Sequence, residues 1–186
     1  MRTTEEELVI DFQKGDDLAY ATLYNRYKKQ VYAFCFKMVM DEDNVKDIVQ
    51  EVFLKMYEHR LQLAHPEHFR SWLFMIARNQ CMTFYRDRRK NTTIDEDLNN
   101  ELLQTDSLIR SIERSNEVEI VRAYINDLKP EYREVVVLRE YQGLSYDEIS
   151  EVIGSTVSAV KAKLFKARKE LVEKLRPVFL ERSDLK

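Results

Sequence analysis

The stretch around Gly154 limits the possible folds more than any other part of the sequence. Ser145 is followed three residues later by Glu148, a pair typical of the capping box that begins a helix. Gly154 can adopt the left-handed conformation that ends a helix, and Thr156 can cap the next one. A short helix, a tight turn and a second helix form a helix-turn-helix, which we therefore predict for residues 145–175.

Helical periodicity extends over most of the remaining chain. Apolar residues recur at intervals of three and four positions. The 186 residues include 3 glycines and 3 prolines, where average usage would give roughly 13 and 9. So few turn-forming residues argue against sandwiches, barrels and glycine-rich phosphate loops, and we expect an all-α protein. The expected helices cover residues 5–13, 17–38, 43–58, 68–90, 116–128, 130–142, 146–153 and 156–175, with a loop at 60–67.

Charge is divided unevenly along the chain. Residues 1–90 carry 15 Lys/Arg and 14 Asp/Glu, residues 91–115 carry 2 and 6, and residues 116–186 carry 13 of each. The segment 91–115 is also polar and lacks aromatic residues. We therefore expect two small helical domains, 1–90 and 116–186, joined by a flexible acidic linker at 91–115, with the helix-turn-helix in the second domain.

Two basic segments lie in the two expected domains. Residues 68–90 hold six basic residues against Asp87 alone, and residues 155–169 hold five basic residues and no acid. One such segment is usually the solvated face of a helix. Two of them, each on an aromatic or small-residue helix, favour nucleic acid as the partner.

The second helix of the helix-turn-helix has one apolar face and one polar face. On a helical wheel the apolar face contains Val157, Val160, Leu164, Ala167, Leu171 and Leu175, whereas Ser158, Ala162, Phe165, Lys166 and Lys169 lie opposite, flanked by Lys161, Lys163 and Arg168. Small residues near the start would let the helix enter a major groove, where the flanking cations meet phosphates. Phe165 on the polar face suits contact with a thymine methyl group or a sugar. A plain two-helix packing unit is the alternative.

A second patterned face occurs on the expected helix 43–58. Acids, an amide and a leucine share the side opposite the apolar residues: Asp47, Gln50, Glu51, Leu54 and Glu58, called here the acidic stripe. Such a mixture suits contact with a basic helix of another protein. An ordinary solvated face is the alternative.

Several functions are not expected. His59, His65 and His68 straddle a proline without accompanying ligands, so we expect no metal site. No catalytic triad, phosphate-binding loop or paired carboxylates are visible, so we expect neither enzymatic activity nor a cofactor. No apolar stretch is long enough to span a membrane, and an acidic N-terminus suggests a cytoplasmic protein. Cys35 and Cys81 are expected to be reduced, packed thiols.

Three segments together resemble the extracytoplasmic-function sigma factors, the group IV relatives of sigma-70. DNVKDIVQEVFLKMY (43–57) is similar to the family's helix for binding core RNA polymerase. HFRSWLFMIARNQCMTFYRDRRK (68–90) resembles the helix that melts the promoter and reads the minus-ten element. LKPEYREVVVLREYQGLSYDEISEVIGSTVSAVKAKLFKARKEL (128–171) resembles the domain that reads the minus-thirty-five element. The order and spacing match the family over about residues 6–90 and 116–178.

The resemblance implies a sigma factor that binds core RNA polymerase and directs promoter recognition and transcription initiation. The implied domains are sigma region 2 (1–90), which binds polymerase and melts DNA, and sigma region 4 (116–186). The implied partners are core RNA polymerase, promoter DNA as duplex and as melted single strand, and an anti-sigma factor, without membrane insertion. The loop 64–69 is the candidate pocket for an extruded base of the melted strand. Taking a base out of the stack costs a few kcal/mol.

The implied site residues fall into three groups. The acidic stripe, Asp47, Gln50, Glu51, Leu54 and Glu58, would bind polymerase. The minus-ten and melting group is His65, Glu67, His68, Ser71, Trp72, Arg78, Asn79, Met82, Thr83 and Arg86. The minus-thirty-five group is Ser155, Thr156, Ser158, Ala159, Lys161, Ala162, Lys163, Phe165, Lys166, Arg168 and Lys169.

Two other classes of protein compete with this interpretation. A free-standing helix-turn-helix regulator, binding operator DNA as a dimer, would account for residues 116–186. It would not account for the second basic helix and the acidic stripe of residues 1–90. An adaptor that binds only proteins would leave the basic recognition face unexplained.

Overall fold

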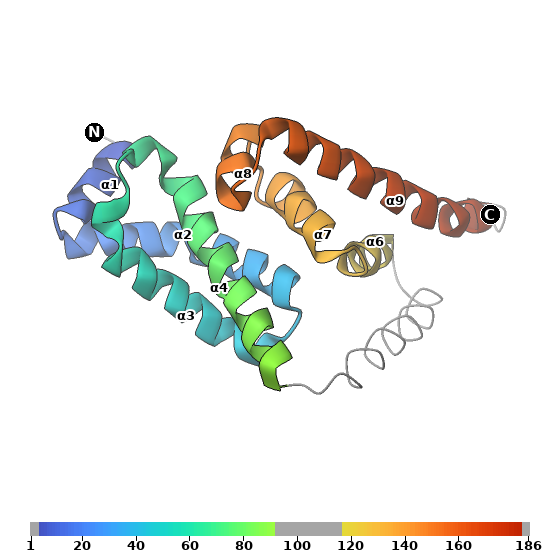
Figure 1. The fold of residues 1–186 in the computed structure, drawn as a ribbon, viewed down its shortest axis with the longest axis horizontal. Helices are drawn as coiled ribbons and strands as arrows, with labels where there is room; N and C mark the ends of the chain where they lie inside the picture. Colours follow the sequence, from blue (N-terminus) through green and yellow to red (C-terminus); the bar gives the residue numbers. More distant parts are fainter. Residues whose placement is uncertain (1–3, 92–116, 184–186) are drawn as a thin grey trace.

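The computed structural model describes residues 4–91 and 117–183, and within these ranges it contains helices and turns but no β-strand (Figure 1). The all-α prediction is therefore confirmed. The two ranges are called here the N-terminal half and the C-terminal half. Residues 92–115 of the expected linker lie outside the described residues, so the prediction that this segment is flexible stays a prediction.

The N-terminal half is built from helices packed around one core. The helices are α1 (Glu5–Gln13), α2 (Asp17–Val39), α3 (Glu42–Glu58) and α4 (Phe69–Asn91), with two short 3₁₀ turns, η1 (Arg60–Gln62) and η2 (Pro66–His68), where a loop was expected. The cap of α2 is Asp16, whose carboxylate accepts from the Leu18 and Ala19 amides. Asp41 caps α3. Phe34, Leu73 and other large apolar side chains fill the core.

The C-terminal half contains the helix-turn-helix. Its elements are α6 (Glu117–Asn126), α7 (Pro130–Val136), a π-helical turn η3 (Val137–Tyr141), α8 (Tyr146–Ile153) and α9 (Val157–Ser183). The capping box of α8 is present, with Ser145 N donating to Glu148 Oε2 at 2.7 Å and Glu148 N donating to Ser145 Oγ at 3.1 Å. Gly154 ends α8 at φ 62°, and the side chain of Thr156 accepts from the Ala159 amide. The predicted motif is therefore confirmed in its local geometry.

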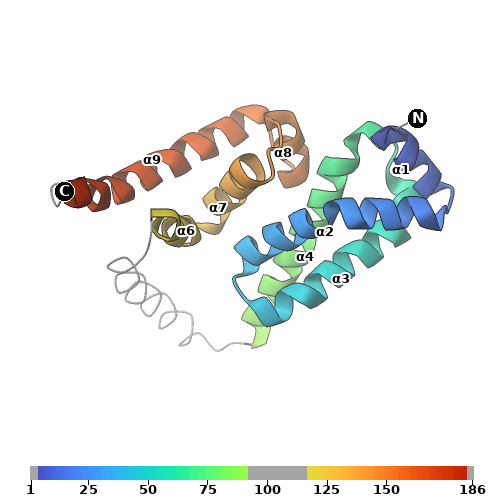
Figure 2. The same cartoon turned by 180° about the vertical axis from the view of Figure 1, so that it is seen from behind.

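The two halves pack against each other, which the sequence did not suggest. α8 lies against α4, and α2 contacts α7 and η3; Figures 1 and 2 show α8 beside α4 from opposite sides. A continuous cluster of buried apolar residues runs through both halves. In both views α9 lies on the side of the C-terminal half that faces away from α2 and α3.

A buried arginine joins the two halves. Arg133 on α7 donates to the carbonyl of Met38 at the end of α2, at 3.3 Å, and to the carbonyl of Leu128 at 3.2 Å. The hydroxyl of Tyr85 on α4 donates to the same Met38 carbonyl. Burial lowers the pKa of Arg133. The bond from Arg133 to Met38 crosses between the halves, and because hydrogen bonds from charged donors are the stronger ones, it favours the packed arrangement.

The cysteines give a first testable prediction. Cys35 and Cys81 are fully buried free thiols on α2 and α4. A hydrogen bond with Cys81, together with burial, raises the pKa of Cys35. Since the thiolate is the reactive form, we expect native protein to react with DTNB only slowly and both thiols to react at once in 6 M guanidinium. Rapid reaction of either thiol in native protein would show that this core opens readily.

Candidate nucleic-acid and polymerase surfaces

The outer face of α9 presents the residues expected to contact duplex DNA. Phe165 is 70% exposed, whereas Val160, Leu164 and Ala167 on the opposite face are buried. Among the predicted residues Ala159 and Lys163 are half-buried, and the others, Ser155, Thr156, Ser158, Lys161, Ala162, Lys166, Arg168 and Lys169, are exposed like Phe165. The α9 surface, meaning these residues, is therefore continuous and open to solvent.

The cations of the α9 surface differ in their partners. Arg168 pairs with Glu140 at 2.6 Å and Lys163 with Glu131 at 3.4 Å. Lys169 is 3.8 Å from Glu173, and Lys161 lies 5.5 Å from the centre of the Tyr146 ring. Lys166 has no ion-pair partner within the described ranges. A phosphate could therefore bind Lys161 or Lys166 without displacing a carboxylate, and within the described ranges Lys166 has no ring partner either.

The residues predicted for single-stranded DNA lie on α4 and the loop before it, called here the α4 surface. His65, Glu67, His68, Asn79 and Arg86 are exposed; Trp72, Arg78, Met82 and Thr83 are half-buried; and Ser71 is buried. A cavity with a volume of about 340 Å³ lies beside the loop 64–69, where the pocket for an extruded base was predicted. Its lining includes Leu63, Ala64, His65, His68, Ser71, Trp72 and Met75.

Carboxylates from the C-terminal half occupy part of the α4 surface. Glu151 on α8 also lines the pocket, and it accepts from Ser71 Oγ and lies 2.8 Å from His68 Nδ1. Glu134 on α7, only 3% exposed, pairs with Arg78. In this arrangement Ser71, His68 and Arg78, all predicted to bind DNA, are bound to carboxylates of the C-terminal half instead.

These contacts make the packing of the halves depend on pH. Glu151 raises the pKa of His68 by hydrogen bonding and charge, and this contact joins residues of the two halves. His68 therefore binds its proton more tightly when the halves are packed. This contribution to packing is fully present below the ordinary pKa of about 6.5 and is lost as pH rises through the raised value. Raising the pH should thus favour separation.

Trp72 can report this titration. It is the single tryptophan and lines the pocket together with His68 and Glu151. We expect its fluorescence to titrate with a midpoint above 6.5, and Glu151→Gln to lower that midpoint. His65→Gln is the control, because His65 lines the same pocket but pairs with Glu67. An unchanged midpoint in Glu151→Gln would contradict the assigned cause.

The acidic stripe lies on the solvent face of α3. Asp47, Gln50 and Glu58 are exposed, Leu54 is 50% exposed, and Glu51 is half-buried and pairs with Lys55 at 3.0 Å. The opposite face carries the buried Val45, Ile48, Val52, Phe53 and Met56. An exposed leucine surrounded by polar and charged side chains suits an apolar contact within a polar rim.

Sequence reasoning missed Glu134 and Glu151 as partners of the α4 surface. One signal was available, because Glu134 directly precedes the apolar run Val135–Leu138 and is therefore an unusual place for a carboxylate. In residues 4–91 and 117–183 no cluster of histidine, cysteine, aspartate and glutamate could hold a metal ion. Within the same ranges, no helix has the length and apolar character needed to cross a membrane.

Comparison with known proteins finds one family along most of the chain. Residues 23–91 match the family model "Sigma-70 region 2", and residues 119–171 match "Sigma-70, region 4". The ECF RNA polymerase sigma factor SigM of Bacillus subtilis is 31% identical over 150 residues, covering 80% of this chain and 90% of that protein. The ECF RNA polymerase sigma-E factor of Escherichia coli K12 is 29% identical over 184 residues, covering 94% and 96%.

A solved structure shares the fold. CnrH, solved in complex with the cytosolic domain of CnrY, superposes with a TM-score of 0.70 at 24% identity, covering 93% of this chain and 97% of CnrH. The chain belongs to the extracytoplasmic-function RNA polymerase sigma factors of the sigma-70 family, which direct core RNA polymerase to promoters and initiate transcription.

Proposed function

We propose that this sigma factor divides promoter recognition between its two halves, with domain boundaries near 1–90 and 116–186. The α9 surface reads the minus-thirty-five duplex, and the α4 surface reads and melts the minus-ten region. Cations and an exposed aromatic ring on α9 suit a major groove. Histidine, tryptophan and arginine around the pocket at 64–69 suit an unstacked base and its backbone.

The acidic stripe is the proposed contact with core polymerase. It is the patterned face of α3 that remains open to solvent, and it lies on a helix whose other side is fixed in the core. We further propose that an anti-sigma factor holds the chain in its inactive state. The relevant parallel is the sigma factor RpoE of Bartonella quintana, solved with the anti-sigma factor NepR, which shares the fold at 20% identity and a TM-score of 0.63.

One observation carries the proposed division of labour. The α9 surface is open, whereas Ser71, His68 and Arg78 of the α4 surface bind Glu151 and Glu134. Duplex binding by α9 is therefore compatible with the packed arrangement, but full contact of the α4 surface with melted DNA requires the halves to separate. The structure described here is thus the form expected before promoter melting.

Run-off transcription with purified core polymerase tests this proposal on closed and pre-melted templates. Lys166→Gln should weaken duplex binding and lower its salt slope by about one, with little effect on the pre-melted template. Asn79→Ala should bind the duplex normally but fail to open it, and the pre-melted bubble should rescue it. Equal loss on both templates with either variant would refute the division. Tight duplex binding without polymerase would favour the free-standing regulator.

A further inference from the structure

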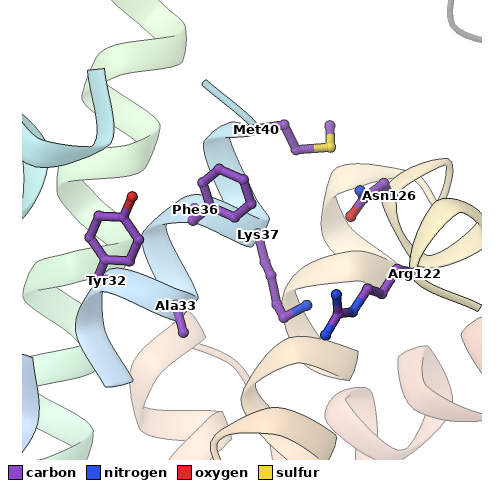
Figure 3. Close-up of a pocket in the computed structure, with 7 residues that line it drawn as sticks. All are labelled: Tyr32, Ala33, Phe36, Lys37, Met40, Arg122 and Asn126. Carbon is purple, nitrogen blue, oxygen red and sulfur yellow. The ribbon is translucent and has the colours of Figure 1, made fainter. Parts of the chain in front are cut away.

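A second cavity, of about 470 Å³, lies between the two halves (Figure 3). Tyr32, Ala33, Phe36, Lys37 and Met40 line it from α2 and its C-cap, and Arg122 and Asn126 line it from α6. Its volume falls in the range of small-molecule sites, which are often found between domains. No predicted DNA or polymerase contact uses these residues.

Two cations meet in this cavity without a carboxylate. Figure 3 shows Lys37 and Arg122 reaching toward each other from α2 and α6. The Lys37 Nζ lies 3.8 Å from the centre of the Tyr141 ring, but neither cation has a carboxylate partner in the described part of the chain. Burial, and then the charge of Arg122, lower the pKa of Lys37. An anion between the two cations would relieve this repulsion.

An apolar wall lies next to the two cations. The rings of Tyr32 and Phe36 stack with centroids 6.3 Å apart and planes 6° apart. Phe36 is 42% exposed and Met40 is 37% exposed. Large apolar side chains beside a few convergent polar groups are typical of ligand sites.

We propose that this cavity binds an amphipathic anion: a small molecule whose carboxylate or phosphate group lies between Lys37 and Arg122 and whose apolar body covers Phe36 and Met40. Two charge-assisted contacts fix the anionic end, and burial of the apolar body supplies the remaining affinity. Both the anionic group and the apolar body are needed. Inorganic phosphate would leave the rings uncovered, and a neutral apolar molecule would leave the charges of Lys37 and Arg122 without an anion.

The ligand also has a regulatory consequence, which rests on the proposed function. Its site takes residues from both halves, so it binds the packed arrangement more tightly than the separated one. A ligand shifts an equilibrium by its differential affinity for the two states. The amphipathic anion therefore opposes separation of the halves, and by reciprocity core polymerase should weaken its binding.

The test uses 8-anilinonaphthalene-1-sulfonate as a fluorescent amphipathic anion, titrated into the full chain. We expect saturable binding that Lys37→Gln and Arg122→Gln each weaken about tenfold or more. Lys28→Gln is the matched control, because Lys28 lies on the same helix over the Tyr24 ring but outside the cavity. Competition by decanoate or by 1-naphthyl phosphate distinguishes a carboxylate ligand from a phosphate ligand.

The outcomes separate the site from its regulatory role. Binding that both variants leave within twofold of the parent value overturns the proposal. Sensitivity to Lys37→Gln alone overturns the bridging of the two halves. The neutral dye N-phenyl-1-naphthylamine should bind both variants as it binds the parent, and equal loss of this dye would mean that the cavity had collapsed and would overturn the charge argument.

The same anionic dye tests the link to polymerase. Its displacement by core polymerase supports the linkage, whereas its retention in a formed holoenzyme overturns only the linkage. A chain that binds dye but not polymerase refutes the proposed function and leaves the site standing.

Discussion

Glu51→Lys combined with Leu54→Ala is expected to abolish co-purification of this sigma factor with core RNA polymerase. Leu54 is the exposed apolar side chain at the centre of the acidic stripe, and Glu51 adjoins it. Truncating a central apolar anchor and reversing a charge in an interface each cost about 2 kcal/mol or more. Together they should weaken the complex by roughly 1,000-fold, since every 1.4 kcal/mol is tenfold.

The fold should tolerate this double change. The change at Glu51 removes a surface pair with Lys55 that is worth only about 0.2–0.5 kcal/mol. Leu54 is 50% exposed, so truncating it removes little buried contact. A matched control is Glu173→Lys with Leu18→Ala, which reverses one exposed acid on α9 and truncates a leucine that is 76% exposed on α2. Circular dichroism should show the same helicity in all three proteins. Normal co-purification of the folded double variant would show that polymerase binds a surface other than the acidic stripe.

Local features of the fold could be predicted because local rules determine them. Ser145 with Glu148 specified the start of α8, and the positive φ of Gly154 requires the residue type found there. The wheel placed Leu54 and Phe165 on solvent faces, where the structure has them. Adjacent aspartates at 16 and 17 both suit a cap, so the sequence left the start of α2 ambiguous by one residue.

The contact between the halves could not be predicted in the same way. Ser71 and Glu151, or Arg78 and Glu134, lie far apart in the chain, and periodicity carries no information about such pairs. The π-helical turn at Val137–Tyr141 was also missed, because a run of valines and leucine fits a regular helix equally well. For these reasons the residues of the α4 surface were identified by resemblance, whereas their carboxylate partners were not identified at all.

Removing the two carboxylates that cover the α4 surface should strengthen binding to core polymerase. Glu134→Gln leaves the half-buried Arg78 without its charge partner, and Glu151→Gln removes the partner of His68. Breaking a fully buried pair costs about 3–5 kcal/mol. Burial of Glu134 raises its pKa and so offsets part of the gain from the pair, and Arg78 is 27% exposed, so we expect about 2 kcal/mol for the two changes together. The separated form then becomes about thirtyfold more populated.

Apparent affinity depends on the population of the competent form. If about 1% of the parent chain is separated, a thirtyfold rise brings the apparent affinity for core polymerase up by about tenfold or more. Small-angle scattering of the double variant should show a larger radius of gyration, and a polymerase titration should show tighter binding. Lowering the pH should favour packing in the parent and change the variant little, because in the variant His68 has lost the Glu151 partner that raises its pKa.

A matched control distinguishes release from a general loss of negative charge. Glu131→Gln with Glu140→Gln also neutralises two carboxylates of the C-terminal half, but these pair with Lys163 and Arg168 on α9 rather than with α4. This control should strengthen duplex binding through the freed cations and leave polymerase affinity and the radius of gyration unchanged. If it increased polymerase affinity as much as Glu134→Gln with Glu151→Gln does, overall charge rather than the covered α4 surface would govern assembly.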